Sequence, residues 1–239
     1  MKTTTLIAAA GLIALSGAAH ALGTAQFTGD ATFNELCNRG TSNQDCEFAI
    51  GELRGGNNAR NGDWEVGVQR PGQGPDQSRQ NKWSNGSAAA FTFDYVAATG
   101  ALSLALDGGP MSILQLGPNG LDAARSLFVR ARSEDAANKV ELTNLTLGGH
   151  VLDDILFAGG GSAGASYLRV DGFDFGADWT LAGDATFSWE GTMPRGSRLG
   201  VNFKVTDVEP VAPVPVPAAG VLLVGALGAL GLARRRRRG

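Results

Sequence analysis

The chain has 239 residues, of which 35 are glycine, and only 18% of its residues are charged. Glycine at about twice its average usage disfavours long helices and supplies turns, so the composition favours many short strands. The formal net charge is −3, but Lys2 and five C-terminal arginines provide six of the 20 basic residues. The remaining 14 basic residues face 23 acidic ones. This acidic balance argues against a nucleic-acid partner, because phosphate binding needs a basic surface.

Residues 1–21 have the three parts of a secretory signal peptide. Lys2 gives a positive start, residues 6–15 form an apolar run, and Ala19-His20-Ala21 supplies the small residues before a cleavage site. The apolar run is too short to span a bilayer, which needs about 20 residues. We therefore predict that signal peptidase cuts after Ala21 and that the mature chain begins at Leu22. The alternative is a buried core helix at the N-terminus.

Cys37 and Cys46 are the only cysteines, and they enclose eight residues. In an oxidising compartment, a close pair of this kind usually forms a disulfide. A loop this short adds roughly 2–3 kcal/mol of stability in the chain-entropy picture. The alternative is a metal site, but the only histidine beyond the predicted signal peptide is His150, which lies far from both cysteines in sequence. We predict the disulfide.

Residues 22–208 are predicted to form an all-β extracytoplasmic domain. A hairpin is expected around Thr99-Gly100, because apolar residues alternate with polar ones on both sides of this turn. The alternating apolar residues are Phe91, Phe93, Tyr95, Leu102, Leu104 and Leu106. Further strands are expected at 127–132, 140–147, 167–170, 179–181, 185–190 and 199–206. Turns rich in Gly, Asp and Asn separate them, which favours an antiparallel, jelly-roll-like β-sandwich. The helix candidate is 121–125.

The last thirty residues differ in composition from the rest of the chain. Residues 209–217 are rich in Pro and Val and predict an extended linker. Residues 218–233 carry no charge and are followed by Arg234, Arg235, Arg236, Arg237 and Arg238, with Gly239 last. Sixteen apolar residues are few for a membrane helix, but long basic side chains at its end can reach the headgroups. Because positive charge stays cytoplasmic, the predicted helix leaves 234–239 inside and the body outside, in agreement with the signal peptide.

This three-part tail resembles the PEP-CTERM sorting signal of Gram-negative exported proteins. The motif residues are Val214, Pro215, Val216, Pro217 and Ala218, followed by the Gly/Leu/Ala helix and the arginines. The resemblance implies recognition by exosortase, a membrane-embedded cysteine transpeptidase that cuts near the proline motif. It also implies delivery to the periplasm, cell surface or extracellular matrix. Val-Pro-Val-Pro replaces the family's Pro-Glu-Pro, which leaves the cleavage position open. The alternative is a permanent single-pass membrane anchor.

The body also resembles the choice-of-anchor domains, in particular their W-type. These are β-rich modules joined to alternative surface-anchoring tails. The likeness covers most of residues 60–208 and lies in residues 61–66, 91–108, 142–149 and 178–207. Such domains share no established activity, so the resemblance implies a fold and a location and leaves the ligand open.

No motif commits the chain to a reaction. His150 follows two glycines, so it is expected to be a turn residue rather than a catalytic base. Paired carboxylates could serve glycoside hydrolysis, and Asp171 with Asp174 could help to ligate calcium. The acidic candidates are Asp153, Asp154, Asp171, Asp174 and Glu190. Acids in the loops of an acidic β protein are usually solvated, and we predict no catalytic residue, metal or cofactor.

The four tryptophans could stack on sugar rings wherever they are exposed. They are Trp64, Trp83, Trp179 and Trp189. Trp179 and Trp189 lie in predicted strands and are expected in the core. Trp83 lies in the polar stretch 70–87, which is expected to be a long flexible loop, so Trp83 is expected to be exposed.

Three functions remain open on these grounds. The first is a non-enzymatic surface or matrix protein delivered by exosortase-type sorting, and this is our prediction. The second is a carbohydrate-binding module at the envelope that contacts extracellular polysaccharide, which an exposed Trp83 would favour. The third is a glycan hydrolase held by an uncleaved anchor, which convergence of Asp153, Asp171 or Glu190 would favour.

Overall fold

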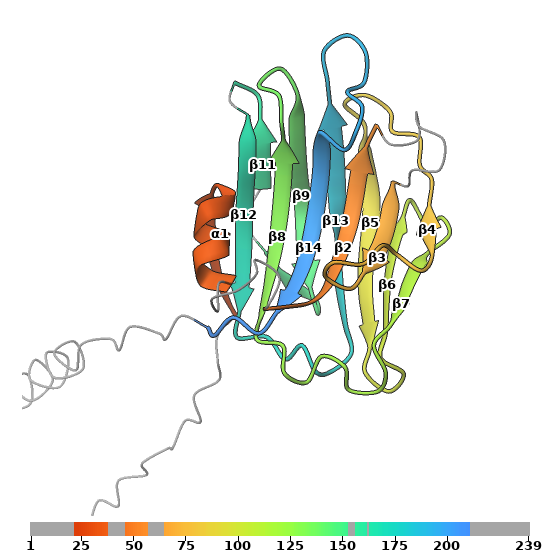
Figure 1. Cartoon of the computed structure of the whole chain (residues 1–239), viewed down its shortest axis with the longest axis vertical. Coiled ribbons are helices and arrows are strands. Elements are labelled where there is room, and N and C mark those ends of the chain that lie inside the picture. Colours follow the sequence, from red (N-terminus) through yellow and green to blue (C-terminus); the bar gives the residue numbers. More distant parts are fainter. Residues whose placement is uncertain (1–21, 38–45, 57–64, 153–155, 162, 211–239) are drawn as a thin grey trace, which may run out of the picture. The chain divides into compact units, whose positions relative to one another are not determined.

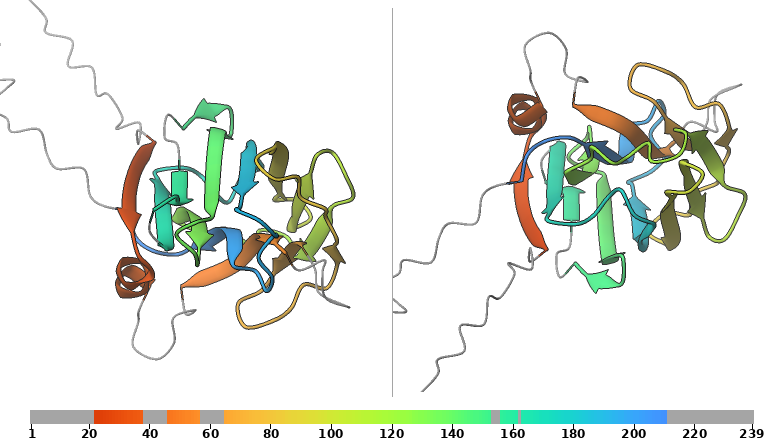
Figure 2. Two further views of the ribbon diagram at one scale, coloured as in Figure 1. Left: turned by 90° about the horizontal axis from the view of Figure 1, so that it is seen from above. Right: turned by 90° about the horizontal axis from the view of Figure 1, so that it is seen from below.

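The computed structural model describes residues 22–37, 46–56, 65–152, 156–161 and 163–210. Within them the chain is all-β, with two antiparallel sheets and one helix, α1 (Asp30–Cys37). Figure 1 shows the strands, and Figure 2 shows the two sheets from their ends. The chain divides into two compact units, residues 1–209 and 210–239, and both sheets belong to the first.

The sheets contain seven strands each. Sheet A has, in spatial order, β1 (Gly23–Thr28), β12 (Gly164–Asp171), β8 (Ser126–Ser133), β14 (Leu199–Thr206), β2 (Glu47–Gly55), β3 (Val66–Gln69) and β4 (Ser78–Arg79). Sheet B has β10 (His150–Val151), β9 (Lys139–Leu147), β13 (Trp179–Ser188), β5 (Ala88–Val96), β6 (Ala101–Leu106) and β7 (Ser112–Gln115), with β11 (Leu156–Gly159) also paired to β9. The predicted two-sheet sandwich is confirmed.

The predicted hairpin is present as β5 and β6, with Phe93 opposite Leu104 in the register. Gly100 closes the turn with a φ of 67°, a conformation that side chains other than glycine rarely adopt. The strands predicted at 179–181 and 185–190 are one strand, β13, which is interrupted by a bulge between Ala182 and Asp184. The core-facing residues Trp179, Leu181, Ala185 and Phe187 keep one alternation throughout, but the position between Leu181 and Ala185 is Gly183, where Leu145 and Phe91 leave no room for a side chain. In the sequence, this glycine resembles a turn between two strands.

The helix predicted at 121–125 is wrong, because residues 118–123 form consecutive turns and residues 124–125 are irregular. Leu121 and Ala124 are buried at the spacing that suggested a helical face. The hydroxyl of Tyr95 accepts a 3.2 Å hydrogen bond from the Leu121 backbone N–H, which holds the segment against the end of β5. The helix that does form, α1, lies in a segment for which no helix had been predicted.

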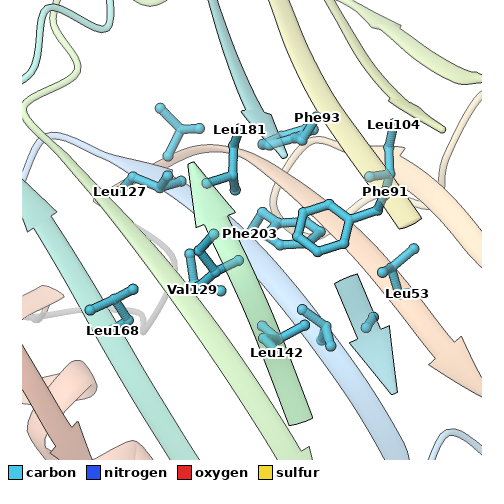
Figure 3. Close-up of a cluster of buried hydrophobic side chains, with 14 of the residues drawn as sticks. Leu53, Phe91, Phe93, Leu104, Leu127, Val129, Leu142, Leu168, Leu181 and Phe203 are labelled. Atoms are coloured by element: carbon cyan, nitrogen blue, oxygen red, sulfur yellow. The ribbon is translucent and has the colours of Figure 1, made fainter. Parts of the chain in front are cut away.

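The main core fills the space between the inner faces of the two sheets (Figure 3). The Phe203 ring of β14 lies 4.8 Å from Phe91 and 5.4 Å from Phe93 across the sandwich. Gly51 and Gly55 of β2 face such rings directly. A Cβ on Gly51 would lie 2.9 Å from Phe93, and one on Gly55 would lie 2.9 Å from Phe187. These glycines are therefore required for packing inside a strand.

A second, smaller core packs side chains of α1 against the outer face of sheet A. Figure 1 shows α1 beside β12 of this sheet. The ring of Tyr167 lies between those of Phe27 and Phe33, with centroids 4.9 Å and 5.3 Å away and nearly parallel planes. Cys37 at the end of α1 forms the predicted disulfide with Cys46, with their Cα atoms 5.2 Å apart. The disulfide ties α1 to the start of β2, so the helix is fixed to the sheet face by a covalent bond as well as by packing.

The terminal segments lie outside the described residues. They include Ala19 and Ala21 of the predicted signal peptide and the motif Val214, Pro215, Val216, Pro217 and Ala218. They also include the predicted spanning helix 218–233 and Arg234, Arg235, Arg236, Arg237 and Arg238. Within the described ranges, no helix is both long enough and apolar enough to cross a membrane.

Candidate binding cleft on the outer face of sheet A

A row of polar side chains crosses the outer face of sheet A. The register aligns one residue from each of four strands, β12, β8, β14 and β2. These residues are Tyr167, Arg130, Asn202 and Glu52. Their chain neighbours Leu168, Val129, Val201 and Leu53 belong to the main core. Because side chains alternate between the faces of a strand, the row must point away from that core.

The row is connected by hydrogen bonds that begin on α1. Arg130 makes a bidentate contact with Asp30 of α1, from Nε to Oδ1 at 2.8 Å and from Nη2 to Oδ2 at 2.6 Å. The hydroxyl of Tyr167 donates to Asp30 Oδ1 at 2.7 Å. Arg130 Nη1 donates to Asn202 Oδ1 at 3.0 Å, and Asn202 Nδ2 donates to Glu52 Oε1 at 2.8 Å. These contacts follow one another from Asp30 to Glu52, so they link the helix and the four strands into one polar network. The hydrogen bonds that involve a charged partner are the stronger ones.

The network shifts the pKa of two of its members. Burial alone would raise the pKa of Asp30, but the hydrogen bonds from Arg130 and Tyr167 and the positive charges of Arg130 and Lys204 outweigh it. The pKa of Asp30 therefore lies below its ordinary value. Burial raises the pKa of the Tyr167 hydroxyl above its ordinary value, against the opposing charge of Arg130. Tyr167 therefore stays protonated and remains a donor to Asp30.

Acid is expected to weaken the attachment of α1. A carboxyl with a lower pKa in the folded state stabilises the fold above its unfolded pKa, here near 3.8, and loses this contribution as the pH falls through the folded pKa. At neutral pH we expect Asp30→Asn to lower the free energy of unfolding by about 1 kcal/mol or less, because the exposed Asp30 side chain is screened by solvent. This difference should shrink between about pH 5 and pH 2 in urea unfolding curves. A difference that stays constant over that range would contradict the assignment.

A cleft of about 350 Å³ lies beside the network and is bounded by α1 and by sheet A. The helix contributes Asp30, Phe33 and Asn34 to its lining. The strands contribute Glu47, Ile50, Glu52, Gln69, Arg130, Tyr167, Asn202 and Lys204. Acidic, basic and amide side chains therefore share one small concave surface, with the apolar side chains of Phe33 and Ile50 among them.

Glu47 is the most deeply buried carboxylate of the cleft, with a side chain that is 1% exposed. Its Oε1 pairs with Nζ of Lys204, and this ammonium also lies 4.6 Å from the centre of the Phe33 ring. Among the described residues, Oε2 of Glu47 has no hydrogen-bond partner. A buried acceptor without a donor is unfavourable, so this oxygen lowers the stability of the buried pair.

The expected exposure of Trp83 is wrong, because its side chain is buried at 6% exposure. The ring stacks on Phe187 of β13 at 4.1 Å, and Nε1 donates to Glu65 Oε2 at 2.9 Å and to the Arg54 carbonyl at 2.8 Å. The stretch 70–87 is therefore fixed to the sandwich through Trp83, and it contains the short strand β4. Trp179 is buried as predicted and Trp189 is partly buried, while Trp64 lies outside the described residues.

Of the acidic candidates for hydrolysis, Asp171 and Glu190 lie in the described part of the chain, and they do not converge. Asp171 pairs in the register with Ser126, the first residue of β8, whereas Glu190 follows β13 at the end where Ser188 faces Lys139. The eight residues of β8 separate these ends by about 23 Å. Asp171 is moreover bonded to Arg169 and Ser126.

The other predicted candidates bring no metal ligands together. Asp174 is exposed and accepts a 3.1 Å hydrogen bond from the backbone of Gly176. His150 is exposed at the start of β10, directly after the Gly148-Gly149 turn. Asp153 and Asp154 lie outside the described residues. Within the described ranges, no group of three or more His, Cys, Asp or Glu side chains could hold a metal ion.

The residues of the cleft were missed when only the sequence was considered. Arg130 alternates with the buried Val129 and Ala131 in a predicted strand, and this alternation alone would place it on an outer face. Glu47 lies outside the predicted strands, so no alternation could place it on a face. It meets Lys204 only because β2 and β14 are neighbours, 157 residues apart in the chain.

The chain matches no protein-family model, and no curated protein matches its sequence. The arguments for function therefore come from the residues and their geometry.

Proposed function

We propose that this chain is an exported, non-enzymatic protein of the cell surface or extracellular matrix of a Gram-negative bacterium, sorted by an exosortase-like transpeptidase. The observation that carries the proposal is the agreement between two independent sequence signals. The N-terminal segment 1–21 and the tail 209–239 both place the body outside the cytoplasm. The Cys37–Cys46 disulfide supports this location, because disulfides persist in oxidising compartments.

In this proposal each terminal segment has its own partner. Signal peptidase removes residues 1–21 after Ala21. Residues 218–233 hold the chain in the inner membrane during transit, and residues 234–238 stop its transfer. The exosortase-like enzyme then acts near Pro217, and the body is delivered to the periplasm, surface or matrix.

The body is proposed to be a jelly roll. The chain passes between the sheets in the order β2, β5, β8, β9, β11, β12, β13 and β14. This path gives the orders β2-β14-β8-β12 in sheet A and β5-β13-β9-β11 in sheet B. Two interlocked sets of four strands are the pattern of a jelly roll, an architecture that includes lectin domains. A binding role fits this body better than hydrolysis, since Asp171 and Glu190 lie at opposite ends of the sandwich.

Intact mass of the protein recovered from its native host tests the sorting proposal. In the wild type we expect the loss of residues 1–21 and a second cut near Pro217. Replacing residues 234–238 by alanine should abolish the second cut, because the tail then lacks its positive charge. The matched control replaces the same five arginines by lysine, which keeps the charge and should preserve membrane orientation. A mature wild-type chain that still ends at Gly239 in the membrane fraction would instead support an ordinary single-pass anchor.

A further inference from the structure

The chain enters and leaves the described body at the same end of sheet A. The register pairs Gly23, the first residue of β1, with Asp171 of β12. It pairs Asp171 with Ser126 of β8, and Ser126 with Thr206 of β14. Neighbouring strands lie about 4.8 Å apart, so the start of β1 and the end of β14 are separated by about 14 Å. The two junctions with the terminal segments therefore share one small area of the body.

At the N-terminal junction, the fold begins directly at the predicted cleavage site. Leu22, the first residue after the predicted cut, is partly buried and packs against the main core. Gly23 is already paired with Asp171 in the sheet. At the other end of β1, the Gly29 N–H donates to the Ala165 carbonyl at 2.8 Å, directly before the disulfide-bonded helix α1. The bond to be cut therefore adjoins the folded body without a spacer.

A paired β1 is a poor substrate for a protease. A protease binds several residues on each side of the bond that it cuts, so β1 must leave the sheet before it can enter the active site. Opening the exposed residues 23–25 frees only about 10 Å of chain and leaves the end of sheet A beside the enzyme. Release of the rest of β1 requires Phe27 to leave its stack on Tyr167, where the ring centroids are 4.9 Å apart. Cleavage of the folded chain is thus limited to its opened population.

At the C-terminal junction, the fold ends well before the proposed cut. Ser126 Oγ donates to the Val208 carbonyl at 2.7 Å. The guanidinium of Arg169, a side chain that is 4% exposed, donates to the Glu209 carbonyl. The proposed cut near Pro217 lies eight residues beyond Glu209, a length of up to about 25 Å in an extended polyproline chain. The C-terminal site therefore has a spacer that the N-terminal site lacks.

We infer that the two cuts of the sorting route differ in their relation to folding. Residues 1–21 are removed before β1 pairs with β12, whereas the tail can be cut from the folded body. The strand order provides the necessary interval, because β12, the partner of β1, comes far later in the chain at residues 164–171. A precursor that folds first keeps residues 1–21 and stays attached to the membrane through them. The inference rests on the proposed function, from which it takes the cut after Ala21.

Cleavage of the folded precursor by purified signal peptidase tests this order. The substrate is the full chain with residues 1–21 in place, folded in detergent with its disulfide formed. The spacer variant carries about eight Gly and Ser residues between residues 22 and 23, as many as in the stretch 210–217, and keeps the residues on both sides of the cut bond. The matched control carries the same insert between residues 210 and 211. Intact mass follows the loss of residues 1–21 with time.

We expect the spacer variant to lose residues 1–21 at least about tenfold faster than the wild type and the matched control. The spacer lets the bond reach the enzyme while β1 stays in the sheet. A synthetic peptide of residues 1–29 lacks β12 and should be cut as readily as the spacer variant. This peptide shows separately whether the enzyme recognises the signal.

Two results would overturn the inference and leave the sorting proposal intact. The first is that the wild-type precursor is cut as fast as the spacer variant. The second is that the spacer variant resists the enzyme although the peptide is cut, because the resistance then does not arise from the nearness of the fold. A peptide that is not cut after Ala21 would remove the signal-peptide step from the sorting proposal, and this inference with it.

Discussion

Replacing Trp83 by alanine is expected to lower the free energy of unfolding by about 3–5 kcal/mol. The substitution removes a ring that is 6% exposed and stacks on Phe187 at 4.1 Å. It also removes the Nε1 donor from Oε2 of Glu65, a residue that is 0% exposed. Trp83 thus fixes the segment that follows β3 to both Glu65 and β13, and its loss combines a cavity with a weakened buried hydrogen bond.

Denaturant unfolding of three variants separates these contributions. Trp83→Phe keeps most of the ring but removes the donor, and it should lower the free energy of unfolding by about 1–3 kcal/mol. Trp83→Ala should lower it further, by the additional loss of packing. Trp189→Ala is the control, because Trp189 is only partly buried at the edge of the core and should have a smaller effect. Equal unfolding midpoints for the wild type and Trp83→Ala would contradict the buried position.

Gly100→Ala is expected to be nearly as damaging, with a loss of about 3–5 kcal/mol. Gly100 has a φ of +67°, and a Cβ built on it would lie 1.6 Å from the carbonyl oxygen of Gly117. The backbone cannot easily move away, since the Gly100 N–H donates to Val96 and its carbonyl accepts from Leu116. An alanine must therefore displace the turn between β5 and β6 or the segment that contains Gly117.

Gly108→Ala is the matched control for this clash. Gly108 also has a positive φ, +64°, but a Cβ there would meet nothing within 4 Å. Its substitution should lower the free energy of unfolding by about 1–2 kcal/mol, because backbone strain is its only cost. Thermal unfolding of both variants measures the difference. Similar losses at the two positions would show that the close approach of Gly117 has no energetic consequence.

The strands that the sequence predicts well are those whose side chains alternate without interruption. In β5, Phe91, Phe93 and Tyr95 face the core, and the residues between them face outward, so the pattern can be recognised locally. In β2 the core-facing positions include Gly51 and Gly55, which are small because aromatic rings from other strands lie against them. Glycine usually indicates a turn in a sequence, and the long-range contact that requires it here has no local signature.

The helix α1 could not be predicted for a related reason. Eight residues are too few for a stable isolated helix, so its stability comes from tertiary contacts. Phe33 and Cys37 are one turn apart and bury against Phe128 and Tyr167 in the second core. Those partners lie more than ninety residues later in the chain.

The candidate cleft depends on strand register and on the packing of α1. Strand pairing brings Arg130, Asn202 and Glu52 of β8, β14 and β2 together, and the packing of α1 on this face adds Asp30. The sequence offers acids that are close together along the chain, Asp153 with Asp154 and Asp171 with Asp174, and in addition Glu190. Spacing predicts proximity in short motifs, but in an antiparallel sandwich the neighbours on a face usually come from distant segments.

The strand order also sets the sequence of events during synthesis. β13 and β14 are the last strands of the described chain, yet β13 lies between β9 and β5 and β14 lies between β8 and β2. A nascent chain that has reached residue 178 therefore has a gap in the middle of each sheet. Neither layer can close until its final strand arrives, so assembly waits for nearly the whole body to emerge. Until β13 and β14 have been made, the earlier strands cannot form either complete sheet, so this strand order delays the formation of a closed sandwich.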